Sequence, residues 1–295
     1  MAQSFRQMLD AQWASGKFLC VGIDPRTEYI SDQFIRPSAI DTVYAFVRAI
    51  TYDTLEVAGC YKFNFAAFSR LGSSGLRLLE GAIGAIQFHA PETPIILDGK
   101  FGDIKTTNED YATWAFNQLG VHAVTVNPYV GIEDLSPFFK YPNRGVFILC
   151  RTSNESAVRG VQGLIAVRKD PRDKPEGISP GAWLEDIVEG TMPLYMHVAR
   201  QAAALECRAT IGLVVGATVP EEIIAGIRSI APNLPFLMPG IGHQGGSLEM
   251  AIKSGSTAAG GVLLSASRSL YSSLGAAARL HQEIKEIRSR LATSR

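Results

Sequence analysis

The three charged residues that are the strongest candidates for catalysis follow the apolar run of residues 94–97. Asp98, Lys100 and Asp103 place two carboxylates close to one amine in the sequence. Clustering like charges would destabilise a loop with a purely structural role, so this pattern is typical of a catalytic site. A lysine flanked by carboxylates stays protonated, which suits it to stabilise developing negative charge and to donate a proton.

Other polar residues lie at the ends of apolar runs that resemble strands. Lys62 lies inside an aromatic segment, where an ammonium group needs a partner or a function. Asp24 before a proline also has the features of a turn residue, and Thr152 and Ser153 also suit ordinary loop hydroxyls. The further candidates at such ends are Asn64, Asn127, Thr218, Gly240, Gly242, Ser267 and Arg268.

A glycine-rich turn from Gly240 to Gly246, followed by Arg268 after the next apolar run, predicts a phosphate site. Glycines let the backbone approach an anion and direct N–H groups at it, and arginine can bind an anion through two donors. Barrel enzymes often hold phosphate between their last two strands. His243 has no second histidine nearby, so we expect no metal site there.

Eight short apolar runs supply strands that would position these residues. They span residues 18–23, 60–65, 94–97, 123–126, 146–150, 211–215, 235–238 and 258–264. Continuous hydrophobicity is typical of parallel strands buried on both faces. We therefore predict an α/β fold, a (β/α)8 TIM barrel, although counting strands leaves an open doubly wound sheet as an alternative.

Segments with helical periodicity separate the runs. Ser38, Thr106 and Thr218 each precede an acidic residue by three positions, a spacing that predicts helix starts. The first of these helices would bury a stripe formed by Val43, Phe46, Val47 and Ile50. The strand and helix patterns thus alternate along the chain.

One segment, residues 154–194, interrupts this alternation. Its centre, residues 168–175, is polar and contains two prolines. We predict an inserted loop region within a single barrel domain of residues 1–295, with the loop acting as a lid over the site.

Composition narrows the class of protein. The 28 basic and 28 acidic residues cancel, which argues against a nucleic-acid or membrane surface. The cysteines lie at least 40 positions apart without metal-binding or redox spacing, so we expect buried, reduced thiols. The first residues lack a signal-peptide pattern and no apolar run reaches membrane-spanning length, so we expect a cytoplasmic protein.

The motif after the third run resembles that of the orotidine 5'-phosphate decarboxylase family, in its subgroup of longer bacterial chains. Its residues are Asp98, Lys100, Asp103, Ile104 and Thr107. Related phosphosugar barrels share part of this motif, but Asp24 and Lys62 narrow the choice. The likeness extends from about Phe18 to Arg268.

The resemblance implies decarboxylation of orotidine 5'-monophosphate (OMP) to UMP and CO2 without a cofactor or metal. Lys100 would protonate C6 of the pyrimidine, and Asp98 would lie beside the departing carboxylate. The resemblance also implies a homodimer with shared active sites. Asp103, Ile104 and Thr107 would then reach into the partner's site.

The resemblance assigns the remaining contacts as well. Asp24 and Lys62 would bind ribose hydroxyls, with Lys62 also joining the charged array, while Ser153 or Thr152 would meet the pyrimidine. Gly242 and Arg268 would hold phosphate, and Asn127, Gly240 and Ser267 are further expected substrate contacts. Gln162 and Gln244 are alternative candidates for a side chain that closes over the phosphate.

Three other functions remain open from the sequence. A hexulose-phosphate synthase type of enzyme would use Mg²⁺, but it needs another acidic ligand near Asp98, and Lys62 occupies the second strand. A Schiff-base aldolase could use Lys62 or Lys100 but needs a neutral amine, whereas flanking aspartates favour the protonated form. A non-catalytic nucleotide-binding barrel is the third alternative.

Overall fold

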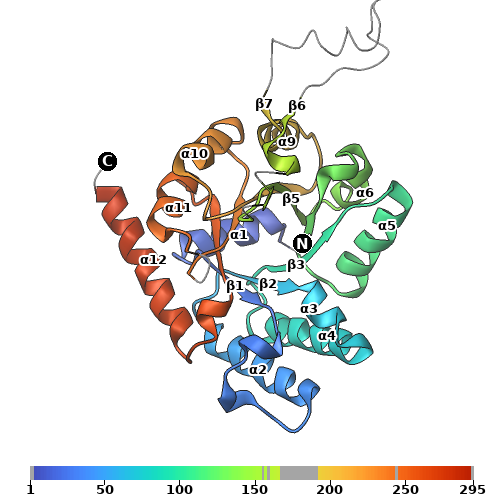
Figure 1. Cartoon of the computed structure of the whole chain (residues 1–295), viewed down its shortest axis with the longest axis vertical. Helices are drawn as coiled ribbons and strands as arrows, with labels where there is room; N and C mark the ends of the chain where they lie inside the picture. Colours follow the sequence, from blue (N-terminus) through green and yellow to red (C-terminus); the bar gives the residue numbers. More distant parts are fainter. Residues whose placement is uncertain (1–2, 155, 158–159, 167–191, 243–244, 294–295) are drawn as a thin grey trace, which may run out of the picture.

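Eight parallel strands close into a barrel in the computed structural model, which describes residues 3–154, 156–157, 160–166, 192–242 and 245–293 (Figure 1). The order around the barrel is β1-β10-β9-β8-β5-β4-β3-β2. The strands are β1 (Leu19–Ile23), β2 (Cys60–Asn64), β3 (Ile95–Phe101), β4 (Ala123–Val126), β5 (Gly145–Arg151), β8 (Thr210–Val215), β9 (Phe236–Pro239) and β10 (Val262–Ala266). Each overlaps one predicted run, so the predicted (β/α)8 TIM barrel is confirmed.

Helices cover the outside of the barrel and follow the strands in turn (Figure 1). They are α2 (Ala39–Thr54), α3 (Phe65–Ser69), α4 (Gly72–His89), α5 (Lys105–Thr113), α6 (Ser136–Phe139), α9 (Leu194–Ala203), α10 (Glu221–Ile230), α11 (Leu248–Gly255) and α12 (Ala276–Thr293). Every residue of β1, β4 and β10 is buried between these helices and the barrel interior. This burial explains the continuous hydrophobicity of the runs.

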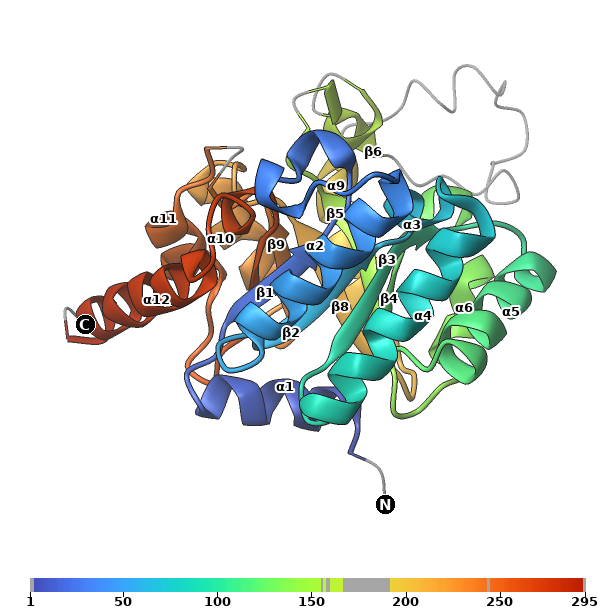
Figure 2. The ribbon, with the colours of Figure 1, turned by 90° about the horizontal axis from the view of Figure 1, so that it is seen from below.

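One further helix, α1 (Phe5–Ala14), lies across the end of the barrel at which the strands begin (Figure 2). Phe5, Leu9 and Trp13 are buried on its inner face. The Phe5 ring packs edge-to-face on Phe147 of β5 at 5.8 Å, and the Trp13 indole N–H donates to the Val262 carbonyl at 2.8 Å. The helix therefore closes the amino end of the barrel and leaves its carboxyl end for function.

Strand β3 extends further than the predicted run. It continues to Phe101, so Asp98 and Lys100 lie within the strand and not after it. Its pairing with β4 shifts register between Leu97 and Phe101. The irregularity surrounds the two charged residues, and such local breaks in a ladder re-aim side chains.

The predicted start of α2 is confirmed, whereas two other predicted starts are wrong. The N-cap of α5 is Ile104, which leaves Thr106 inside the first turn. The N-cap of α10 is Pro220, and the Thr218 hydroxyl instead donates to the Ser153 carbonyl at 3.4 Å. At Thr218, a contact with a residue distant in sequence takes the place of the predicted cap.

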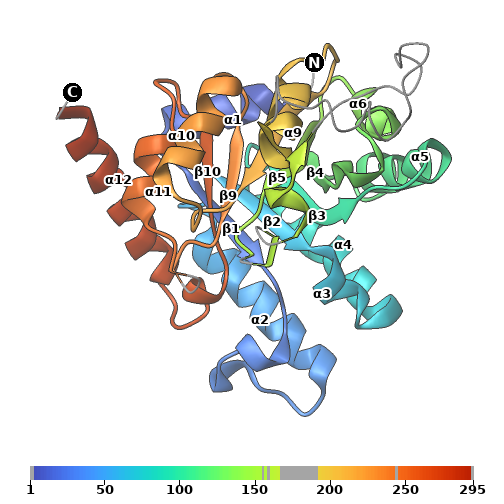
Figure 3. The same cartoon turned by 45° about the horizontal axis from the view of Figure 1, so that its top comes forward.

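Of the predicted insertion at residues 154–194, the segment 167–191 lies outside the described residues, and its role as a lid stays a prediction. On its flanks, β6 (Ile165–Ala166) pairs antiparallel with β7 (Met192–Pro193). Helix α9 begins directly after β7 and packs against β5 and β8 (Figure 3). The flanks thus return the chain to the barrel beside the strand that precedes the insertion.

Three of the four cysteines are buried as expected, and Cys207 is not. All four are free; Cys20, Cys60 and Cys150 are buried and Cys207 is exposed. Within the described ranges, none of the helices combines the length and the apolar character needed to cross a membrane.

Candidate active site

The predicted site residues gather at the carboxyl end of the barrel. Lys62 lies in β2, and Asp98 and Lys100 lie in β3. Directly or shortly after their strands come Asp24 (β1), Asn127 (β4), Thr152 and Ser153 (β5), Gly240 and Gly242 (β9), and Ser267 and Arg268 (β10). Loops after parallel strands converge at this end, which is where barrel enzymes carry their chemistry.

A cluster of three side chains, Lys62, Asp98 and Lys100, forms the centre of this site. The Lys62 Nζ donates to Asp98 Oδ2 at 3.0 Å, and the Lys100 Nζ donates to Asp98 Oδ1 at 2.6 Å. The side chains of Lys62 and Asp98 are 10% and 11% exposed, whereas that of Lys100 is 49% exposed. Asp98 and Lys62 are therefore fixed inside the barrel, while Lys100 reaches into the open end.

Electrostatics keep this cluster charged. Burial alone would raise the pKa of Asp98, but the two ammonium groups outweigh it and hold that pKa well below its ordinary value. Burial alone would lower the pKa of Lys62, but the charge on Asp98 reverses this and raises the pKa. Asp98 is therefore a carboxylate at neutral pH, and Lys62 is an ammonium.

The backbone of Lys100 adopts an unusual conformation. Among the described residues it is the only non-glycine with a positive φ, at 50°. This left-handed conformation costs about 1 kcal/mol or more for a residue with a side chain, so other contacts must hold it. The Lys100 backbone N–H donates to the Thr125 hydroxyl at 2.9 Å, and that hydroxyl donates to Asp98 Oδ1 at 2.8 Å.

Asp24 lies beside the cluster. Its negative charge also raises the pKa of Lys62, although less than Asp98 and Cys20 do. Its carboxylate accepts from Arg26 at 3.2 Å, and its backbone N–H donates to the Tyr271 hydroxyl at 2.7 Å. These contacts fix the turn after β1, and the Asp24 side chain remains 22% exposed. Asp24 can therefore be both a structural turn residue and a residue of the site.

The turn after β9 has the geometry expected of an anion site. Gly240 and Gly242 adopt φ values of 103° and 78°, which a residue with a side chain rarely adopts. A side chain at Gly242 would also lie 2.9 Å from Ser269 of the neighbouring segment. Arg268 follows β10, with its guanidinium 5.2 Å from the ring centre of Tyr29. The turn residues His243 and Gln244 lie outside the described residues.

After β5, hydrogen bonds join two of the candidate residues, Thr152 and Gln162. The Thr152 backbone N–H donates to Gln162 Oε1 at 3.0 Å, and Gln162 Nε2 donates to the Thr152 hydroxyl at 3.0 Å. Ser153 packs closely on Gly216 of the next strand end, where a Cβ would lie 2.7 Å from the Ser153 nitrogen. Gln162 is therefore held at the site, next to the predicted pyrimidine contacts. Asn127, after β4, is exposed, and its side chain accepts from the Tyr129 backbone.

Three motif residues stay apart from the cluster within one chain. Asp103 and Ile104 are exposed in the loop before α5, and Thr107 lies in the first turn of that helix. The Asp103 carboxylate accepts the Ile104 backbone N–H at 2.7 Å, and Asn108 binds the Asp103 backbone on both sides. The loop is thus locally braced while its side chains remain available to another molecule.

Sequence reasoning missed two residues of this site. Thr125 lies in the apolar run of β4 and is 1% exposed, so its only signal was one hydroxyl in an otherwise apolar strand. Tyr271 is buried, and its hydroxyl joins the Gly22 carbonyl, at 2.6 Å, to the Asp24 backbone N–H. In the sequence, neither Thr125 nor Tyr271 can be distinguished from an ordinary core residue.

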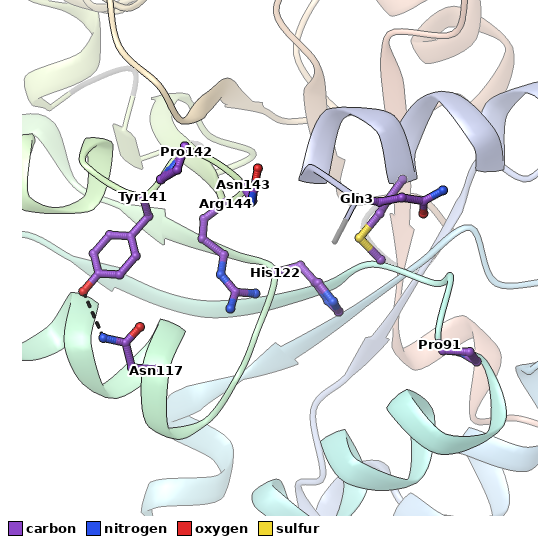
Figure 4. A pocket seen from close by; sticks show the side chains of 9 residues that line it. Gln3, Pro91, Asn117, His122, Tyr141, Pro142, Asn143 and Arg144 are labelled. Atoms are coloured by element: carbon purple, nitrogen blue, oxygen red, sulfur yellow. Dashed lines mark hydrogen bonds between the residues drawn. The ribbon is translucent and has the colours of Figure 1, made fainter. Parts of the chain in front are cut away.

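A separate pocket of about 400 Å³ opens at the amino end of the barrel (Figure 4). Two of its polar side chains, Arg144 and His122, bind the backbone. Arg144 donates to the Val121 carbonyl at 3.0 Å and to the Phe116 carbonyl at 3.1 Å. His122 accepts the Ile95 backbone N–H through Nδ1 at 3.1 Å. Burial and the charge of Arg144 lower the pKa of His122 to about 4, so the ring is neutral.

The closed barrel, with its charged cluster at the carboxyl end, defines a (β/α)8-barrel enzyme. No group of three or more His, Cys, Asp or Glu side chains that could hold a metal ion occurs in the part of the chain that the structure describes. The model of the "Orotidine 5'-phosphate decarboxylase / HUMPS family" matches residues 17–169.

Named relatives agree over nearly the whole chain. The orotidine 5'-phosphate decarboxylase of Cellvibrio japonicus is 38% identical over 92% of this chain and 91% of its own. That of Thermomicrobium roseum is 36% identical over 98% of both chains. The solved OMP decarboxylase of Leishmania donovani has a TM-score of 0.78 at 33% identity and covers 97% of this chain and 99% of its own. The chain belongs to the orotidine 5'-phosphate decarboxylase family.

Proposed function

We propose that this protein decarboxylates orotidine 5'-monophosphate to UMP and CO2 in pyrimidine biosynthesis. The observation that carries the proposal is the Lys62–Asp98–Lys100 cluster, with Lys100 reaching into the open end of the barrel. The names of the close relatives support the same reaction.

In this reaction the C6–carboxylate bond of OMP breaks and its electron pair stays on C6. That orbital lies in the plane of the ring, so the ring π-system cannot delocalise the charge. The Lys100 ammonium would stabilise the carbanion and then transfer a proton to C6, becoming a neutral amine that water reprotonates. The charge on Asp98 keeps Lys62 protonated and attracts Lys100 through the 2.6 Å contact.

The substrate would lie across the carboxyl end of the barrel. We assign Asp24 and Lys62 to the ribose, Thr152 or Ser153 to the pyrimidine, and Arg268 with the Gly242 turn to the phosphate. Asn127, Gly240 and Ser267 would complete the contacts. Because the phosphate is remote from C6, its binding energy can favour the closed, reactive arrangement of the site.

A Mg²⁺-dependent synthase is the nearest alternative. Both carboxylate oxygens of Asp98 already accept from ammonium groups, which occupy the positions that a cation would take. Removing Lys62 would be needed to open the carboxylate to a metal. The arrangement therefore favours the decarboxylase.

Loss of OMP absorbance, followed with purified protein in excess chelator, tests the function. We expect turnover that is insensitive to the chelator. Absence of turnover by folded wild-type protein would reject the decarboxylase, and abolition by chelator would favour the metal enzyme.

We also propose a homodimer in which Asp103, Ile104 and Thr107 serve the neighbouring site. Asp103 and Ile104 are exposed before α5, away from the cluster of their own chain, and Thr107 is half-buried in the first turn of that helix, which supports this assignment. Mixing inactive Lys100→Ala protein with inactive Asp103→Ala protein should restore activity, because some mixed dimers would hold one complete site. No recovery despite demonstrated subunit exchange would reject shared sites.

A further inference from the structure

We infer that Thr125 is a positioning residue for the decarboxylation: its hydroxyl group locks the Asp98 carboxylate and the Lys100 backbone into one arrangement. This inference rests on the proposed function for its kinetic consequence. The contacts that carry it belong to the folded chain and can be tested without turnover.

The two hydrogen bonds of Thr125 have fixed directions. The Lys100 backbone N–H can only donate, so the Thr125 oxygen accepts it, at 2.9 Å. A carboxylate can only accept, so the single hydroxyl hydrogen points to Asp98 Oδ1, at 2.8 Å. Because Lys100 Nζ donates to the same oxygen at 2.6 Å, a closed ring runs from the Lys100 backbone through Thr125 and Asp98 to the Lys100 side chain.

This ring holds in place the Lys100 side chain, which is the most exposed member of the cluster. The Lys100 side chain is 49% exposed and long, and its backbone has the φ of 50° that a side chain disfavours. Without an acceptor for its N–H, the backbone loses the contact that opposes relaxation. The ammonium would then leave the position from which it can reach C6, and small displacements of a reacting group cost large factors in rate.

Packing does not explain the hydroxyl. Thr125 lies between Val124 and Val126, which are both fully buried, and is itself 1% exposed. Valine has the same branched shape and would fill the strand equally well. A buried hydroxyl is favourable only where it is hydrogen-bonded, and here both of its partners are site residues.

The test compares Thr125→Val, which removes the hydroxyl, with Thr125→Ser, which keeps it. We expect the valine variant to lower kcat about 10- to 100-fold with KM within about threefold, because hydrogen bonds to charged groups are among the strong ones. We expect serine to restore kcat to within about threefold. A matched control is Thr54→Val. Thr54 is a fully buried threonine at the end of α2, and its hydroxyl hydrogen-bonds the Ile50 and Thr51 carbonyls and the Tyr61 hydroxyl. The kcat of this variant should stay unchanged.

An unchanged kcat in folded Thr125→Val protein, or equal losses in the valine and serine variants, would overturn the inference. If the valine variant does not fold, Thr125→Ala removes the hydroxyl without placing a methyl group in its position, and the same outcomes for kcat apply to it.

Crystal structures separate this inference from the proposed function. If wild-type protein does not turn over OMP, the function fails, and Thr125 is judged on conformation alone. We expect a positive φ for Lys100 in the wild type and a displaced Lys100 in Thr125→Val. An identical Lys100 in both would overturn the positioning role.

Discussion

Each end of this barrel holds a partly buried cation, but the two cations are bound differently. At the carboxyl end, Lys100 pairs with another side chain, Asp98, and remains 49% exposed. At the amino end, Arg144 donates to the backbone carbonyls of Val121 and Phe116. Lys100 is thus held by one buried carboxylate and is itself half-exposed, whereas Arg144 is tied to the backbone at two points.

This difference predicts separate consequences. A cation bound to backbone carbonyls cannot leave without orphaning them, so it contributes to stability. A half-exposed ammonium beside a carboxylate can turn toward a substrate charge at little cost. We therefore expect changes at the carboxyl end to affect turnover and changes at the amino end to affect unfolding, in agreement with the division of labour in TIM barrels.

Among changes that leave Lys100 in place, the largest effect should follow from Asp98→Asn. The amide leaves Lys62 and Lys100 without a shared counter-charge, so we expect kcat/KM for OMP to fall about 10³-fold. The absorbance assay measures this. Glu109→Gln is a matched control, because its ion pair with Lys140 is exposed on both sides and should contribute little. Comparable activity of the two variants would contradict the central place of Asp98.

Arg144→Met should produce the opposite pattern. Two buried carbonyls lose their donors, so we expect the free energy of unfolding to fall by about 2–4 kcal/mol with kcat nearly unchanged. Urea denaturation measures the first quantity. Arg268→Met is the counterpart at the carboxyl end and should raise KM without a matching loss of stability. If both variants changed the same quantity, the contrast between the two ends would be wrong.

His122 should make the amino end sensitive to pH. The folded pKa is about 4, and the ordinary value is about 6.5, so the unfolded chain takes up a proton that the folded one does not. Stability from this residue is complete above the ordinary pKa and declines as the pH falls through the interval between the two values. Between pH 7 and 5.5 the loss should be about 1 kcal/mol.

His122→Asn should remove that dependence, since the amide oxygen can accept the Ile95 N–H in place of Nδ1. Urea denaturation of both proteins at the two pH values gives the difference. Equal slopes in wild type and variant would assign the pH dependence to other groups.

The smallest effect should come from Thr51→Val on α2, outside both ends. The Thr51 hydroxyl is buried without a hydrogen-bond partner among the described residues. Removing it should change stability by less than about 1 kcal/mol, in the stabilising direction, and leave kcat unaltered. A clear destabilisation in urea would reveal a partner for this hydroxyl.

The sequence predicted most of the fold and the charged centre because their signals are strong and local. Continuous apolar runs marked the strands, and a lysine inside an aromatic strand marked Lys62 as unusual. The contribution of Thr125 depends on the juxtaposition of β3 and β4, so spacing along the chain could not reveal it. The cap predicted at Thr218 failed because its hydroxyl binds Ser153, which is distant in sequence.

The most direct test of the account compares OMP turnover by wild-type protein and Lys100→Ala under saturating substrate. Lys100 would supply both the proton and the adjacent positive charge, so we expect kcat to fall at least about 10⁴-fold while circular dichroism shows an intact fold. Turnover by folded Lys100→Ala protein within about tenfold of the wild type would contradict the assignment of Lys100 as the proton donor.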